Sequence, residues 1–153
     1  MPQLHDIPVR VEASTPSMRD FGNALPILAE IRQALARFAA TGEPAQIDLA
    51  AIPFGPGDEE RLLGLLGRGE VEATVEALGP TRIWETRFPG IWVVDYSNAD
   101  GQRIALQIEV DEVPRLLRTQ PADLAHSLST LDARLAAAAD AASPAPGDGV
   151  TEQ

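Results

Sequence analysis

The 153-residue chain contains no cysteine and only two histidines, His5 and His126. Without thiols the chain cannot form disulfides, thiolate nucleophiles, Fe–S ligands or Cys-based zinc sites. Two imidazoles are too few for a His-rich metal site. We therefore expect neither a bound metal nor another cofactor.

Basic residues and long apolar runs are also scarce. Twelve Lys and Arg residues stand against 23 Asp and Glu residues, which gives a net charge of −11. This charge repels phosphate backbones and anionic membranes, although acidic surfaces also serve solubility alone. No run approaches the roughly 20 apolar residues that span a bilayer, and no basic region precedes an apolar segment at the N-terminus. We expect a cytoplasmic protein without nucleic-acid binding or membrane insertion.

The length of the chain favours one domain with its own hydrophobic core. Residues 1–20 mix Pro, Ser, Thr and charged residues without a period and predict an irregular arm. Residues 141–153 predict a disordered tail, because they contain little that could be buried. Residues 21–140 are then expected to form a single α+β domain.

Two helices are predicted in the first half of the chain. The first begins at Asn23, a common N-cap residue, and ends at Gly42. The second follows Pro56-Gly57 and ends at Gly67. Three acidic residues in its first turn complement the helix dipole. Both segments carry apolar residues at helical spacing, so each is expected to bury one side.

Two more helices are predicted near the C-terminus. A short one follows Val113-Pro114, and a long one begins at Pro121. The long helix is expected to bury a stripe of four leucines, namely Leu124, Leu128, Leu131 and Leu135.

Between these helical regions the hydrophobic period changes to two, which is typical of strands. Four such runs, separated by turn residues, are 70–78, 81–88, 91–97 and 102–110. Ile47-Asp48-Leu49 predicts a short additional strand. The pattern indicates an antiparallel meander sheet of four to five strands, with helices packed mainly on one face.

Two-residue turns at Gly79-Pro80 and Pro89-Gly90, with a four-residue loop at residues 98–101, would fix the register of this meander. Trp84 then pairs with Val75 on one side and Asp95 on the other, and Val93 pairs with Leu106. Nearly every apolar residue falls on one face, so Trp84 is predicted to lie in the core. Asp95 is the exception on that face.

The opposite face carries the second tryptophan. The same register places Arg87 between Glu72 and Trp92, and Tyr96 opposite Arg103. Because aromatic residues are enriched at binding hot spots, we consider this face a candidate contact surface. Its predicted partner-binding residues are Trp92, Val94, Tyr96, Arg87, Glu85, Gln107 and Glu109. The alternative is that another segment covers this face and buries Trp92, because a continuous apolar run, residues 91–94, is typical of doubly covered strands.

No set of residues predicts catalysis. The acidic clusters at 58–60 and 109–112 have no nearby histidine for acid–base chemistry. Ser127 and Ser129 have no base and orienting group to activate them. Gly55-Pro56-Gly57 lacks the Lys and Ser/Thr of a phosphate-binding loop. We therefore expect no catalytic residue and no enzymatic activity.

Eight segments, in order along residues 22–135, resemble the C-terminal domain of the HupH/HyaF hydrogenase expression and formation proteins. They are Gly22–Arg32, Thr41–Pro44, Pro56–Glu60, Leu65–Val71, Ala77–Pro80, Glu85-Thr86, Pro89–Trp92 and Ile108–Val110. Many family members carry additional sequence upstream of this domain. This chain has only a short arm there, so we expect a function located upstream to be absent.

The resemblance implies an accessory factor, not an enzyme, in the maturation of uptake [NiFe] hydrogenases, on the small-subunit side. Its partner would be the precursor small subunit or another maturation protein. The acidic Glu85 and Glu109 favour a basic partner segment, such as a twin-arginine signal region. Two alternatives stay open: a small-molecule-binding domain, and a structural module that dimerises through its sheet edge or its last helix.

Overall fold

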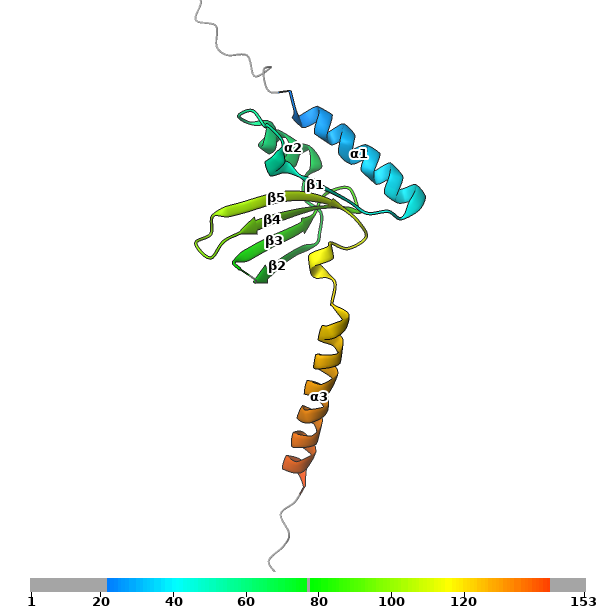
Figure 1. Ribbon diagram of the computed structural model, residues 1–153, viewed down its shortest axis with the longest axis vertical. Helices are drawn as coiled ribbons and strands as arrows, with labels where there is room; N and C mark the ends of the chain where they lie inside the picture. The colour runs from blue at the N-terminus through cyan, green and yellow to red at the C-terminus, as the bar shows by residue number, and fades with distance from the viewer. Residues whose placement is uncertain (1–21, 77, 144–153) are drawn as a thin grey trace, which may run out of the picture. The chain divides into compact units, whose positions relative to one another are not determined.

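A computed structural model describes residues 22–76 and 78–143 (Figure 1). The predicted arm 1–20 and most of the predicted tail lie outside these residues. The elements, in chain order, are α1 (Ala24–Thr41), β1 (Ala45–Asp48), η1 (Leu49–Ala51), α2 (Asp58–Leu66), β2 (Glu72–Glu76), β3 (Pro80–Glu85), β4 (Ile91–Ser97), β5 (Arg103–Val110), η2 (Arg115–Leu117) and α3 (Pro121–Ala142). The chain divides into two compact units, Met1–Pro114 and Arg115–Gln153, and each is described by itself.

The first unit contains a five-stranded antiparallel sheet with the strand order β1-β5-β4-β3-β2. Strands β2 to β5 form a meander, and the short β1 pairs with β5. Helices α1 and α2 lie on the same face of this sheet (Figure 1). The predicted α+β fold with an antiparallel sheet is therefore confirmed.

The hydrophobic core lies between these two helices and the sheet face that they cover, which we call the helix face. Ile27 and Ile31 of α1 pack there with Leu62 and Leu66 of α2. The strands contribute a second set of buried side chains: Ile47, Trp84, Ile91, Val93, Leu106 and Ile108. Burying one such aliphatic side chain contributes about 1.5–3 kcal/mol, so this layer dominates the stability of the unit.

Glycines end both helices as the sequence predicts. Gly42 adopts φ 70°, and its N–H donates to Phe38 O at 2.7 Å. Gly67 closes α2 in the same way, donating to Leu63 O at 2.9 Å. Asn23 is the N-cap of α1 as predicted, but its side chain makes no capping bond and donates instead to Pro53 O. Asn23 thus connects the start of α1 to the loop before α2.

The register differs from the predicted one by two residues in the centre of the sheet. Trp84 pairs with Val93, and Val93 pairs with Ile108. The difference arises because the turn after β3 includes residues 86–90, with Ile91 N bonded to Phe88 O at 3.0 Å. A slip of two keeps every side chain on its predicted face. Trp84 therefore lies on the helix face and is 6 % exposed, which confirms its predicted place in the core.

The register of the edge strand β2 differs by three residues and reverses its faces. Val75 pairs with Thr81, and Glu72 takes the place opposite Trp84. The predicted pairing of Glu72 with Arg87 is therefore wrong. Glu72 forms an ion pair with Arg68 at 3.3 Å, and the Arg68 guanidinium lies 4.3 Å from the centre of the Trp84 ring.

Asp95 is buried on the helix face, where a carboxylate needs charged partners. Arg103 supplies them in a two-bond arrangement: Nε donates to Oδ1 at 2.9 Å and Nη2 to Oδ2 at 3.1 Å. Arg103 also donates to Glu59 of α2, and Arg82 lies 3.6 Å from Asp95 Oδ2. The hydrogen bond to Asp95 is the main cause of the raised pKa of Arg103. This network, which replaces the predicted contact between Arg103 and Tyr96, connects α2 to the sheet.

We predict that Arg103→Met lowers the free energy of unfolding by about 1–3 kcal/mol, because a buried carboxylate loses its two-bond partner. Arg82→Met, which removes only the longer contact to Asp95, is the matched control and is expected to cost less. Urea denaturation of the two variants measures the difference. Equal stability of both variants and wild type would show that the Arg103 bonds contribute nothing.

The second unit contains the long helix α3, and its predicted start at Pro121 is confirmed. The helix continues to Ala142, two residues into the predicted tail. The predicted burial of its leucines is not found within this unit. Leu124, Leu128, Leu131 and Leu135 are 57–63 % exposed, and no residue of α3 is buried.

Candidate functional site

The sheet face opposite the helix face carries most of the predicted partner-binding residues, and we call it the Trp92 face. Trp92 of β4 pairs with Glu85 of β3 and with Glu109 of β5. Val94 and Gln107 form a neighbouring pair on the same face. Directly opposed side chains in antiparallel strands lie about 4.5–5.5 Å apart at Cβ. The strands therefore place an indole between two carboxylate-bearing residues.

The side chain of Trp92 is buried, with 5 % exposure. Its Nε1–H donates to Asp111 O at 3.1 Å, which fixes the indole to the end of β5. Ile83 and Val94 on the same face are fully buried. The prediction of an exposed Trp92 is therefore wrong, and the alternative of a covered strand describes this residue. The indole can lie beneath a contact surface, but it is not exposed for a partner to contact directly.

The accessible part of the Trp92 face includes three polar residues of the predicted set. Tyr96, Glu85 and Gln107 each keep partial exposure. Gln46 of β1 donates to the Gln107 side-chain oxygen, so part of the amide is already used. Burial, with a smaller contribution from the charge of Glu109, raises the pKa of Tyr96, which keeps its phenol neutral. A neutral phenol next to carboxylates can donate a hydrogen bond to a partner.

Two acidic residues at the end of β5 and directly after it, Glu109 and Asp111, are buried. Glu109 is 7 % and Asp111 is 8 % exposed. The backbone N–H of Asp111 donates to Gly90 O at 3.0 Å, and its Oδ1 accepts from Glu112 N at 2.7 Å. Because Glu109 is mostly buried, Glu85 has the more accessible carboxylate of the two residues that pair with Trp92.

Arg87 is the one predicted site residue that the structure places elsewhere. It follows β3 and has no register position on the Trp92 face. Its N–H donates to Leu66 O at 3.0 Å, and its side chain passes so close to Gly67 that a Cβ there would lie 2.7 Å from Arg87 Cδ. Arg87 therefore lies at the end of α2, and the predicted contact with Trp92 is wrong.

The predicted partner-binding set leaves out two residues of this face, Ile83 and Thr81. Both alternate with Trp84 along β3, so they point to the side opposite the core. They are nevertheless buried, at 0 % and 4 % exposure. The signal that could have indicated them is the continuous apolar pair Ile83-Trp84, which repeats the doubly buried pattern of β4.

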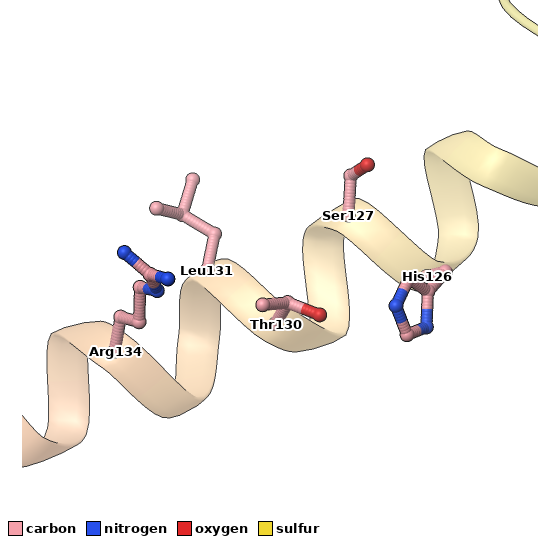
Figure 2. A pocket seen from close by; sticks show the side chains of 5 residues that line it. All are labelled: His126, Ser127, Thr130, Leu131 and Arg134. Atoms are coloured by element: carbon pink, nitrogen blue, oxygen red, sulfur yellow. The ribbon is translucent and has the colours of Figure 1, made fainter. Parts of the chain in front are cut away.

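The described residues offer little chemistry beyond this face. No group of three or more metal-ligating side chains is found among them. None of the helices in the described part of the chain has the length and apolarity to cross a bilayer. A recess of about 410 Å³ lies along α3, and its described lining comes from that single helix: His126, Ser127, Thr130, Leu131 and Arg134 (Figure 2). Side chains of one helix alone do not enclose a ligand.

Comparison with known proteins decides the family. The pattern described as "HupH hydrogenase expression protein, C-terminal conserved region" matches residues 21–138. The chain belongs to this family. The predicted resemblance is therefore confirmed, and it covers α1 through most of α3.

Individual relatives agree with this assignment. The hydrogenase expression/formation protein HoxQ of Azotobacter vinelandii is 34% identical over 111 residues, which cover 71% of this chain and 39% of the relative. HupQ of Azotobacter chroococcum mcd 1 is 33% identical over 124 residues, covering 80% and 43%. The chain thus spans about two fifths of the length of these relatives. The solved structure of the hydrogenase expression protein HupH from Thiobacillus denitrificans ATCC 25259 is 44% identical with a TM-score of 0.71, covering 75% of this chain and 96% of that one.

Proposed function

We propose that this HupH-family chain is a non-enzymatic accessory factor for the formation of an uptake [NiFe] hydrogenase and acts in the cytoplasm. It would bind the precursor small subunit or another maturation protein. The observation that carries this proposal is the family match, together with relatives named as hydrogenase expression/formation proteins. The absence of cysteine supports holding a polypeptide over carrying a metal cluster.

The contact surface that we propose is the accessible part of the Trp92 face. Glu85, Tyr96 and Gln107 supply a carboxylate, a phenol and an amide over a rigid, buried floor of Trp92 and Val94. Glu109, the other carboxylate among the predicted partner-binding residues, flanks this surface. Acidic groups on a fixed sheet attract basic segments and accelerate their association. A twin-arginine signal region has the charge that this surface would select.

A charge reversal tests this surface. We predict that Glu85→Lys reduces capture of the precursor small subunit about tenfold, because one attractive contact becomes repulsive. Glu30→Lys, the same change at an exposed position of α1, is the matched control and is expected to bind as wild type does. Capture is measured with the tagged full chain in extracts of a hydrogenase-expressing strain, at several salt concentrations. Equal loss in both variants would mean that net charge alone matters and that the Trp92 face is not the contact surface.

A further inference from the structure

The leucines of α3 form a seam narrower than a helix needs for packing against a globular core. Leu124, Leu128, Leu131 and Leu135 follow spacings of four, three and four, and Ala138 and Ala142 continue the same seam. This period of 3.5 residues is the one that two supercoiled helices require. A helix on a globular core normally adds large apolar residues beside such a seam.

The residues on either side of the seam are small or polar. One flank holds Ala125, Asp132 and Ala139, and the other holds Ser127, Arg134 and Ala141. Figure 2 shows Leu131 and His126 on different sides of the helix, as this assignment requires. The apolar surface is therefore limited to one line of leucines, each 57–63 % exposed.

We propose that this seam binds the seam of a second copy of the same chain, as an antiparallel two-stranded coiled coil. The seam is self-complementary: Leu124 faces Leu135 of the second copy, and Leu128 faces Leu131 of the second copy. In this arrangement Asp132 lies near Ala125 of the other copy, and Arg134 near Ser127, so like charges do not meet.

Charge favours the antiparallel orientation. Each chain carries a net charge of −11, and the first unit is connected directly to the N-terminal side of α3. A parallel pair would attach both acidic units to the same end. An antiparallel pair attaches them to opposite ends of a helix of 22 residues, about 33 Å long, which is several screening lengths at physiological salt. Antiparallel helix dipoles also attract each other.

The area of the seam sets the strength of the pair. About 12 residues of each helix occupy contact positions, roughly half of the 20–30 residues that a standard interface uses on each side. The dimer is therefore expected to be weak, with a dissociation constant in the micromolar range.

Sedimentation equilibrium of the full chain from about 10 µM to about 1 mM, a range that brackets such a constant, tests the proposal. We expect wild type to pass from monomer to dimer, Leu128→Glu/Leu131→Glu to remain monomeric, and Ser129→Glu/Ala133→Glu to dimerise as wild type does. The control pair adds the same charge away from the seam. A wild type that stays monomeric, or a dimer that survives in the seam variant, overturns the proposal. At a concentration where wild type is also monomeric, a lower melting temperature of the seam variant overturns the proposal as well, because it would mean that the leucines pack against their own chain.

Orientation is read from disulfide formation, because the chain has no cysteine of its own. In the antiparallel pair, a mixture of Leu128→Cys and Leu131→Cys proteins cross-links to each other faster than either does to itself. Faster self-linking of Leu128→Cys would show a parallel pair and overturn the arrangement proposed.

Discussion

Trp92→Ala is expected to lower the free energy of unfolding by about 3–5 kcal/mol, the usual cost of removing a buried aromatic side chain. The indole is 5 % exposed and donates to Asp111 O, so its loss leaves a cavity and removes a buried hydrogen bond. For a domain of this size the melting temperature should fall by about 10 °C or more.

The Trp92→Phe variant separates the two contributions. It keeps an aromatic ring in the cavity but cannot donate to Asp111 O, so we expect a smaller loss of stability than in Trp92→Ala. Calorimetry or circular dichroism on both variants gives the comparison. A Trp92→Ala protein that melts within a degree or two of wild type would mean that the indole is not buried in solution.

Trp84→Ala is the second change with a large expected effect, again about 3–5 kcal/mol. Trp84 belongs to the core cluster on the helix face, which also includes residues of β4 and of both helices. Removing it would open the layer that joins α1 and α2 to the sheet. That cost is a large share of the 5–15 kcal/mol that stabilises a typical domain.

Arg68→Ala is the control for Trp84. It removes the guanidinium 4.3 Å from the ring centre and the ion pair with Glu72 but leaves the indole in place. Exposed contacts of this kind contribute about 0.5–1 kcal/mol, so the variant should remain close to wild type. If Arg68→Ala were as destabilising as Trp84→Ala, surface contacts and not core packing would explain the role of this tryptophan.

The two tryptophans also show how far the sequence could predict the structure. Alternation placed Trp84 and Trp92 on opposite faces of the sheet, and this survived a register difference of two residues because side chains repeat every two residues. The same reasoning failed for β2, where a difference of three exchanged the faces of Glu72 and Val75. The loop lengths that set these registers depend on backbone bonds, such as Thr86 N to Ile91 O, that no residue pattern specifies.

Burial of the second face could not be predicted from alternation. A strand that is apolar on both sides is recognisable, but the sequence does not state what covers it. For α3 the leucine periodicity predicted the helix correctly, and burial was then inferred from apolarity. Apolar spacing shows which side of a helix needs a partner, whereas the identity of that partner depends on the rest of the assembly.

The burial of Trp92 limits which variants can test partner binding. Changes at Trp92 are expected to destabilise the domain, so they cannot separate folding from recognition. Glu85, Tyr96 and Gln107 keep partial exposure and lie over the rigid floor of the sheet. Variants at these three positions should change binding while the melting temperature stays close to wild type.

We propose that this chain assists hydrogenase formation by holding a precursor polypeptide. The most direct measurement is co-purification of the tagged full chain from a hydrogenase-expressing strain, with quantification of precursor and mature small subunit in the same eluate. We expect the precursor to be enriched over the mature subunit, and the enrichment to decline as salt screens the acidic surface. Recovery of neither form, or of both forms in the proportion present in the extract, would contradict the account.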